Sequence, residues 1–378
     1  MSVAEDLSRD QDLSETRDAL HRARHLPGYI YDSPEVYALE KEKIFMRDWL
    51  AMGRVDEIEN PGDYMTFRVL DEPVIISCDN HGNINAFANV CAHRGVEVAS
   101  GNGNLQEFSC PYHGWLYDLE GKLIGAPYMK EAEGFDPASC RLKSLRSSVW
   151  AGWIFINFDD TAAPLEEHVQ FFDDAFGFFH MEDCRLGSKH VTELDCNWKF
   201  VNENLMDVYH FQTLHSGTFG AHLDGEQFKV AVTDKGDVHA FYDAAPNTPD
   251  GKSLFGRIPW LDEDVAENMG CMGFLSPQFH MFGRYDMTLP MIVEPMGTAK
   301  TRVSVFNLYP KDWFGDPDFD GKIKVYHDFI VQILEEDRTM VQGMQRNMGS
   351  NQFHPGPMSK LERTVHNIIN GYLDRIVV

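Results

Sequence analysis

Two short stretches, CAHRG starting at residue 91 and CPYHGW starting at residue 110, each set a cysteine beside a histidine. The two residues are two positions apart in the first stretch and three apart in the second, with sixteen residues between the pairs. Thiolate and imidazole ligands together suit zinc or an iron–sulfur cluster. Zinc fingers usually present two cysteines first and two histidines later on a helix, an order that this chain does not follow. The spacing therefore favours a [2Fe–2S] cluster with mixed ligands, held by Cys91, His93, Cys110 and His113.

The chain around these stretches, from about residue 46 to 160, has the pattern of a small antiparallel β domain. Short β-rich runs are separated by turn-forming pairs such as Asp71-Glu72 and His81-Gly82. The run WLYDLEGKLIGAP predicts a hairpin with Glu120-Gly121 at its tip. We therefore expect both cysteine–histidine pairs at turns between short strands.

The remaining sequence mixes helical and β patterns. The first 45 residues contain helical stretches, and DSPEVYALEKEKIF offers Asp32 or Ser33 as an N-cap with Pro34 in the first turn. Several β runs lie within residues 226–310, and residues 322–348 form a long amphipathic pattern. Strands followed by a packed helix indicate an α+β fold.

The stretch NWKFVNENLMDVYHFQTLHSG, residues 197–217, contains a second set of candidate ligands. A helix is predicted from about Trp198, on which Asp207 and His210 are three apart and share a face. His215 is five residues after His210, a rotation of about 140° along a helix. Both histidines can therefore reach one metal only if the helix bends or ends near residues 212–214.

The long amphipathic pattern offers a third ligand. Its apolar residues lie within about 60° of Ile330 on a helical wheel, namely Tyr326, Ile333, Leu334, Val341 and Met344. Asp337 falls at the centre of this stripe, whereas Glu335 and Glu336 are expected to point away. A carboxylate on an apolar face is costly unless it binds a metal or pairs with an arginine in the core. With two histidines it would complete the facial triad of non-heme Fe(II) oxygenases.

The charge and composition limit the possible partners. The chain has 378 residues and a formal net charge of −26, and such a field repels nucleic acid and anionic lipid. It has no run of 18 apolar residues and no apolar segment near the N-terminus, so we expect a cytoplasmic protein without a membrane span or secretory signal. Seven widely spaced cysteines argue against a disulfide framework.

The run CAHRG…CPYHGWLYDLEG resembles the Rieske signature, and nearly the whole chain is similar to the α subunit of Rieske non-heme iron oxygenases. Neither loop carries the extra cysteine of respiratory Rieske proteins, which favours the oxygenase type. The resemblance implies a Rieske β domain at residues 46–160 inserted in a helix-grip catalytic domain, with a curved antiparallel sheet and a long C-terminal helix. The catalytic domain would comprise residues 161–378, with residues 1–45 as its N-terminal helical segment.

The resemblance also implies roles for individual residues. The family's D-x-x-H-x₄-H stretch matches Asp207, His210 and His215, and its late helical aspartate falls on Asp337, so these two histidines and Asp337 would hold mononuclear iron. Asp207 would link His210 to a cluster histidine of the neighbouring subunit, here His113, and carry electrons across the subunit boundary. The assembly would be a head-to-tail homotrimer.

The function expected from the resemblance is that of a terminal oxygenase. It would use O₂ and electrons from a separate NAD(P)H reductase, with or without a ferredoxin, to mono- or dioxygenate a small organic substrate. An aromatic compound or aromatic acid is the main expectation, with the N-demethylation or monooxygenation of a quaternary amine as the alternative. A Rieske electron carrier and a zinc-stapled binding protein are the rivals from other classes.

The substrate itself is not readable from the sequence, although candidates for the pocket can be named. They lie in the β runs and after the second histidine of the pair: Phe219, Phe274, Phe279, His280, Phe282 and Arg284. An aromatic cage suits a quaternary amine, and an arginine suits a carboxylate. The tail QRNMGSNQFHPGPMSKLE resembles relatives with a free-standing α subunit, although a small β subunit remains an open alternative.

Overall fold

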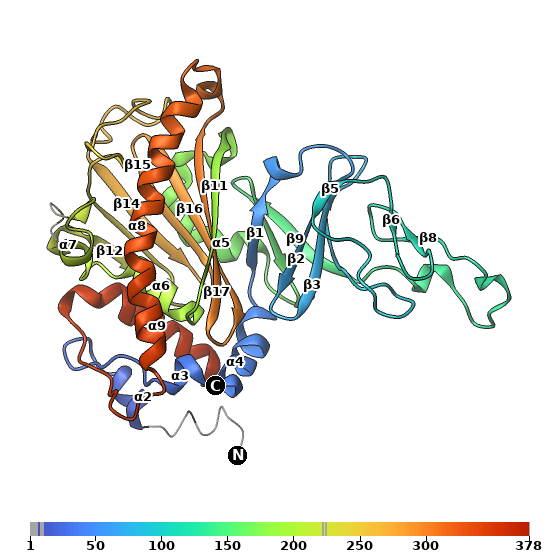
Figure 1. The fold of residues 1–378 in the computed structure, drawn as a ribbon, viewed down its shortest axis with the longest axis horizontal. Helices are drawn as coiled ribbons and strands as arrows, with labels where there is room; N and C mark the ends of the chain where they lie inside the picture. Colours follow the sequence, from blue (N-terminus) through green and yellow to red (C-terminus); the bar gives the residue numbers. More distant parts are fainter. Residues whose placement is uncertain (1–6, 8–10, 221–222, 224, 378) are drawn as a thin grey trace. The chain divides into compact units, whose positions relative to one another are not determined.

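The computed structural model describes residue 7 and residues 11–220, 223 and 225–377. The chain forms two compact units, one made of residues 45–168 and the other of residues 1–44 together with 169–378 (Figure 1). The smaller unit is therefore an insertion in the sequence of the larger one. No helix in these described ranges is long and apolar enough to cross a membrane.

The smaller unit is built from two antiparallel sheets. Its seven-stranded sheet has the order β1-β10-β9-β4-β3-β2-β5 and its three-stranded sheet the order β6-β7-β8. The strands are β1 (Leu50–Arg54), β2 (Asp63–Val69), β3 (Glu72–Cys78), β4 (Ile84–Ala88), β5 (Asn102–Asn104), β6 (Phe108–Ser109), β7 (Leu116–Tyr117), β8 (Leu123–Gly125), β9 (Ser144–Trp150) and β10 (Trp153–Asn157). The turn predicted at Glu120-Gly121 lies between β7 and β8, as expected.

The larger unit contains a curved seven-stranded antiparallel sheet in the order β11-β17-β16-β15-β14-β13-β12. Its strands are β11 (Cys184–Leu194), β12 (Lys229–Val232), β13 (Val238–Asp243), β14 (Met269–Leu275), β15 (Phe279–Arg284), β16 (Met287–Gly297) and β17 (Lys300–Pro310). Register shifts interrupt β11 at 186/188 and β16 at 295/297, and such bulges bend and twist a strand.

Helices accompany this sheet. Figure 1 shows the long helix α8 (Phe319–Asn347) running across it, with α6 (Trp198–Met206) and α9 (Arg363–Ile376) nearby. Helix α6 contacts α8, α9 and three of the strands, so it sits at the centre of the unit. The α+β class and the long helix over a curved sheet were predicted; the helix α9 was not.

The two faces of the sheet are distinguished by the alternation of side chains along each strand. On β14 and β15 a Cβ added at Gly273 or Gly283 would lie 2.6 or 2.5 Å from a ring atom of Phe176 or Phe179. Phe176 ends α5 (Leu165–Phe176) and Phe179 follows it closely, so glycine lets these rings pack on that face. The neighbouring residues Phe282 and Arg284 then point to the opposite face because successive side chains alternate.

A buried carboxylate joins the N-terminal segment to the rest of the larger unit. Ser33 caps α4 (Pro34–Glu40) by accepting hydrogen bonds from the amides of the first turn, as the sequence predicted. At the other end of α4, buried Glu40 forms an ion pair with Lys199 and accepts hydrogen bonds from Trp198 Nε1 (2.8 Å) and the Tyr372 hydroxyl (2.7 Å). A buried charge pair needs further hydrogen bonds to its remaining polar atoms, and Trp198 and Tyr372 supply them to Glu40.

A second carboxylate, Glu203 of α6, lies in the same region. The Tyr31 hydroxyl donates to both of its oxygens, at 2.9 and 3.0 Å. Burial raises the pKa of Glu203 to about 7, against the opposing effects of His25, Tyr31 and Lys199. A carboxyl whose pKa is higher in the folded than in the unfolded state stabilises the protein at low pH, and that contribution is lost as the pH rises towards 7.

We therefore predict that Glu203→Gln, which keeps the acceptor for Tyr31 but cannot ionise, stabilises the protein more at pH 8 than at pH 5. The difference in the free energy of unfolding between the two pH values should change by about 1–3 kcal/mol. Urea unfolding of both proteins at the two pH values measures it, with exposed Glu263→Gln as the control. An equal effect of Glu203→Gln at pH 5 and pH 8 would contradict the buried-carboxyl assignment.

Candidate metal centres

The two cysteine–histidine stretches form loops with the same backbone pattern. In each loop the amide of the cysteine donates to the carbonyl five residues later, Val96 for Cys91 and Trp115 for Cys110, at 2.8 Å. In each, the carbonyl of the cysteine accepts from the glycine four residues later, and both glycines have a positive φ. The loops lie between β4 and β5 and between β6 and β7, at turns between strands as expected.

These loops bring their ligand atoms together in two kinds of environment. The cysteines are buried in the core of the smaller unit, whereas His93 and His113 are exposed and their Nδ1 atoms lie 3.1 Å apart. The His93 ring stacks on Trp115, with 4.8 Å between centroids and an interplanar angle of 9°. Two buried thiols and two exposed imidazoles match a cluster whose histidine-bound iron lies nearer the surface.

The buried side of this site suits sulfur ligands. The Tyr117 hydroxyl accepts a hydrogen bond from the Ala92 amide at 3.0 Å, and its oxygen also lies within hydrogen-bond distance of Cys91 Sγ, 3.2 Å away. Within the described part of the chain, these four residues do not gather into a group that could hold one ion. The donor set therefore fits a two-iron cluster better than a single ion.

The second candidate centre is positioned by a break in the helix that begins at Trp198. Helix α6 ends at Met206, and the Asp207 side chain accepts a hydrogen bond from the Tyr209 amide at 2.7 Å, an arrangement that competes with helix continuation. A single turn, α7 (Phe211–Leu214), follows, with His210 and His215 as its flanking residues. The sequence predicted an end near residues 212–214; the structure has that end and an earlier break at Asp207.

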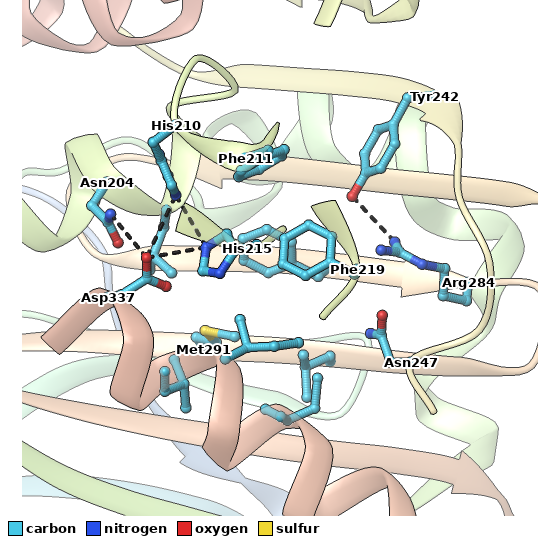
Figure 2. A pocket seen from close by; sticks show the side chains of 16 residues that line it. Asn204, His210, Phe211, His215, Phe219, Tyr242, Asn247, Arg284, Met291 and Asp337 are labelled. Atoms are coloured by element: carbon cyan, nitrogen blue, oxygen red, sulfur yellow. Dashed lines mark hydrogen bonds and ion pairs between the residues drawn. The ribbon is translucent and has the colours of Figure 1, made fainter. Parts of the chain in front are cut away.

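This break brings the two histidines and the aspartate of α8 to one point (Figure 2). The Nε2 atoms of His210 and His215 are 3.2 Å apart, and Asp337 Oδ1 lies 3.5 Å from the first and 3.2 Å from the second. Asn204 Nδ2 also donates to Asp337 Oδ1, at 3.2 Å. Two imidazole nitrogens and one carboxylate oxygen on one side of a metal are the ligand set of non-heme Fe(II) centres.

Each histidine is oriented by a second carboxylate on its other ring nitrogen. Asp207 Oδ2 lies 2.9 Å from His210 Nδ1, and Glu336 Oε2 lies 2.7 Å from His215 Nδ1. The Thr218 hydroxyl donates to the same Glu336 oxygen at 3.0 Å. A carboxylate in this position fixes the tautomer, so that Nε2 presents its lone pair to a metal.

The prediction that Glu336 points away from the centre is therefore wrong. The helical wheel describes Cβ directions on α8 alone, and the long glutamate side chain reaches from the edge of the stripe to His215. Glu335 does point away and binds Arg338 at 2.8 Å. Met344, expected in the stripe, is 39 % exposed, whereas the next residue, Gln345, is buried, so the buried face of α8 passes through Gln345 instead.

The charges of this centre are strongly coupled. Burial lowers the pKa of His210, but the carboxylates of Asp207 and Asp337 outweigh it and raise that pKa to about 9. Burial raises the pKa of Asp337, but its bonds to the two histidines lower it below its usual range. The site thus concentrates negative charge around imidazole nitrogens, as a cation site requires. A second group of possible ligands, His180, Glu182 and Asp183, is exposed.

A pocket opens beside this centre, with a cavity volume of about 60 Å³. Of the six residues predicted to line it, Phe219, Phe282 and Arg284 do so. The other three do not. Phe279 is on the opposite face of the sheet by alternation. His280 Nε2 lies 2.9 Å from Asn202 Oδ1 of α6, and Phe274 belongs to a buried cluster that includes Ile368 of α9. Pocket residues that the sequence analysis missed include Phe211, Tyr242, Asn247 and Met291.

The comparison with protein families gives two matches. Residues 181–377, just over half of the chain, match the family described as ring hydroxylating alpha subunit, catalytic domain. Residues 48–145 match the Rieske [2Fe–2S] domain.

Three relatives illustrate the curated proteins that the chain resembles. The oxygenase subunit of carnitine monooxygenase from Acinetobacter baumannii is 35 % identical over 50 % of this chain and 52 % of its own length. Chloroplastic choline monooxygenase from Arabidopsis thaliana is 29 % identical over 92 % of this chain and 82 % of its own. The oxygenase subunit of glycine betaine monooxygenase from Chromohalobacter salexigens is 27 % identical over 97 % and 91 %. The chain thus spans about half the length of the carnitine monooxygenase subunit that it matches.

Solved structures show the same fold at low sequence identity. One is a quaternary ammonium Rieske monooxygenase, described as revealing insights into carnitine oxidation by gut microbiota and inter-subunit electron transfer, with a TM-score of 0.76, 23 % identity and coverage of 94 % of both chains. Another is naphthalene 1,2-dioxygenase from Rhodococcus sp. bound to indole, with a TM-score of 0.78, 20 % identity and coverage of 97 % of both chains. The fold is therefore shared by proteins named for very different substrates.

The contact between Glu336 and His215 leads to a prediction about metal affinity. Glu336→Gln should weaken binding of a divalent ion at the histidine pair by about 10- to 100-fold, because the amide no longer fixes the tautomer as a carboxylate does. Asp337→Ala should abolish binding. Titration of the metal-free protein with Fe(II) or Co(II) under anaerobic conditions measures both, and Glu335→Gln on the same helix turn is the matched control. Unchanged affinity in Glu336→Gln would show that Thr218 and the backbone alone orient His215.

Proposed function

Because the chain belongs to the ring-hydroxylating α-subunit family of Rieske oxygenases, we propose that it is the terminal oxygenase of a multicomponent system that oxidises a quaternary ammonium compound. The observation that carries this proposal is the convergence of His210, His215 and Asp337 at the end of a pocket lined by aromatic rings. The cofactors are a Rieske [2Fe–2S] cluster and mononuclear iron.

The proposal assigns one centre to each unit. In the smaller unit, Cys91 and Cys110 bind one iron of the cluster, and His93 and His113 bind the other. In the larger unit, Nε2 of His210, Nε2 of His215 and the carboxylate of Asp337 bind the mononuclear iron. The iron, when bound, supplies the site at which O₂ is activated. The units at residues 45–168 and at 1–44 with 169–378 then act as the Rieske and catalytic domains.

The substrate class is proposed from the relatives and the pocket together. The relatives at 27–35 % identity are named for carnitine, choline and glycine betaine, and each of these compounds carries a trimethylammonium group. In the pocket, the Phe219 ring stacks on His215 with centroids 4.8 Å apart, and Phe211 lies edge-on to His210 at 5.0 Å. Aromatic faces attract quaternary ammonium groups through cation–π interactions. The expectation of an aromatic substrate thus gives way to its alternative.

The reaction that follows is a monooxygenation. One O₂, two electrons and two protons convert a C–H bond beside the quaternary nitrogen into C–OH and release one water. The carbon–nitrogen bond of that product then breaks to give an aldehyde, a tertiary amine and a proton. The chain's own residues bind the ammonium group and hold the reacting carbon beside the histidines; the electrons come from NAD(P)H through a separate reductase, with or without a ferredoxin.

We further propose that the protein works as a head-to-tail homotrimer. Asp207 is placed to link the iron centres of two subunits. One of its oxygens lies 2.9 Å from His210 Nδ1, and its side chain is 19 % exposed and so accessible to a neighbouring copy. The histidines of the Rieske domain are exposed as well. Asp207 can therefore accept a hydrogen bond from His113 of a neighbouring copy and link the two centres.

The direct test of this function is turnover with a surrogate reductase. Carnitine, choline, glycine betaine and an aromatic acid such as benzoate are each incubated with the holoenzyme, NADH and O₂. The proposal expects oxygen uptake matched by an aldehyde and an amine product with at least one quaternary compound, and none with benzoate. A cis-diol or phenol from benzoate with no turnover of the quaternary compounds would contradict it.

The proposed bridging role of Asp207 predicts a specific kinetic defect. Asp207→Asn should retain cluster and mononuclear iron yet slow reoxidation of the reduced cluster by O₂ and substrate by about 10- to 100-fold, because the amide no longer links the two histidines as a carboxylate does. Single-turnover absorbance measurements report this rate, and exposed Asp320→Asn is the control. Reoxidation of Asp207→Asn at the wild-type rate would remove the bridging role.

A further inference from the structure

Arg284 places a buried positive charge in the proposed substrate pocket. It is the last residue of β15, is 3 % exposed, and lines the same cavity as the histidine pair. Figure 2 shows its guanidinium group turned into the pocket, beside Tyr242 and Asn247, at the end away from His210 and Asp337. The pocket thus has one end suited to a metal and another that is cationic.

This charge has no carboxylate partner within ion-pair distance among the residues that the structure describes. Asp286 lies near enough for Arg284 to lower its pKa, against the larger effect of burial, but Asp286 Oδ2 accepts instead from the Tyr326 hydroxyl at 2.5 Å. A buried guanidinium that binds no carboxylate directly is costly, and a charged ligand can offset that cost. In a chain of net charge −26, an unpaired buried arginine in a pocket points to an anion.

The hydrogen bonds of Arg284 leave one side of its fork available. Nε donates to the Ala245 carbonyl at 3.1 Å, and Nη1 donates to the Gly283 carbonyl at 2.9 Å and to the Tyr242 hydroxyl at 3.2 Å. These three bonds use one Nε and two Nη1 hydrogens, so both hydrogens of Nη2 remain without a partner in the described chain.

Two neighbours provide further donors. The Tyr242 hydroxyl accepts from Arg284, so its own proton is available to another acceptor. Asn247 is 5 % exposed and lines the cavity, and within the described ranges its side-chain amide forms no hydrogen bond with the protein. A carboxylate, with two oxygens that accept several bonds, matches Nη2, the phenol and the amide together.

Resting on the proposed function, we propose that Arg284, Tyr242 and Asn247 bind the carboxylate of a zwitterionic substrate, so that the enzyme acts on a trimethylammonium carboxylate and not on an amino alcohol. The anion lies on Arg284 Nη2, and the cationic head lies among Phe211, Phe219 and Phe282 near the histidines. This orientation presents carbons attached to nitrogen, and not those beside the carboxylate, to the metal site.

Glycine betaine and choline test this assignment because they share the trimethylammonium head and differ in a carboxylate against an alcohol. Calorimetric titration of the anaerobic holoenzyme should give a dissociation constant at least about tenfold lower for glycine betaine. Arg284→Gln should lower the affinity for glycine betaine by about 10- to 100-fold and change the affinity for choline by less than about threefold. Arg257→Gln is the matched control, since that guanidinium also lies over a tyrosine ring, Tyr285 at 5.8 Å, but does not line the pocket.

The outcomes separate this inference from the proposed function. The carboxylate contact is overturned if the wild-type protein binds choline and glycine betaine with equal affinity, or if Arg284→Gln lowers the affinity for both compounds equally. Either result leaves the proposed function standing. Binding of benzoate but of neither quaternary compound overturns the proposed function. Should Arg284→Gln fail to fold, the methyl ester of glycine betaine decides with the wild-type protein: a loss of about tenfold supports the contact, and unchanged affinity overturns it.

Discussion

The catalytic unit depends on one constraint, the gathering of five carboxylate and imidazole side chains at a single point where α6, α7 and α8 meet. Asp337 lies on the apolar face of α8, and that position is tolerable only because two histidines and an asparagine face it. The histidines in turn are held by carboxylates on their far nitrogens. Removing any one partner would leave a buried charge uncompensated, so the arrangement specifies how the three helices pack as well as where a metal binds.

The sheet serves this centre by dividing its residues between two faces. One face carries glycines where the phenylalanines of α5 and the following turn pack, and the other carries Phe282 and Arg284 into the pocket. Alternation along β15 therefore fixes both the packing of one layer and the chemistry of the other. Strand β15 thus packs against the phenylalanine rings on one face, and on the other face it carries Arg284, the only arginine among the described residues that line this pocket.

The residues of both candidate metal centres could be predicted from the sequence, because the candidate ligands occur at short, regular spacings. The cysteine–histidine loops, the histidine pair and the aspartate within an apolar stripe are all local patterns, and the structure brings the histidine pair and Asp337 together. Glu336 could not be predicted, because its role depends on where a different helix places His215. Tyr242 and Asn247 could not be assigned to the pocket, because their positions depend on how β13 pairs and where the segment after it runs. Alternation along a strand separates Phe279 from Phe282, but it could be applied only once the bounds of β15 were known.

The central claim is that one polypeptide carries two iron centres of different kinds. Iron and acid-labile sulfide analysis of the purified protein, combined with an EPR spectrum of the reduced form, tests it most directly. The account predicts three irons and two sulfides per chain, with a spectrum characteristic of mixed histidine and cysteine ligation. Zinc in place of iron, or two irons with no mononuclear centre in protein of full occupancy, would contradict it.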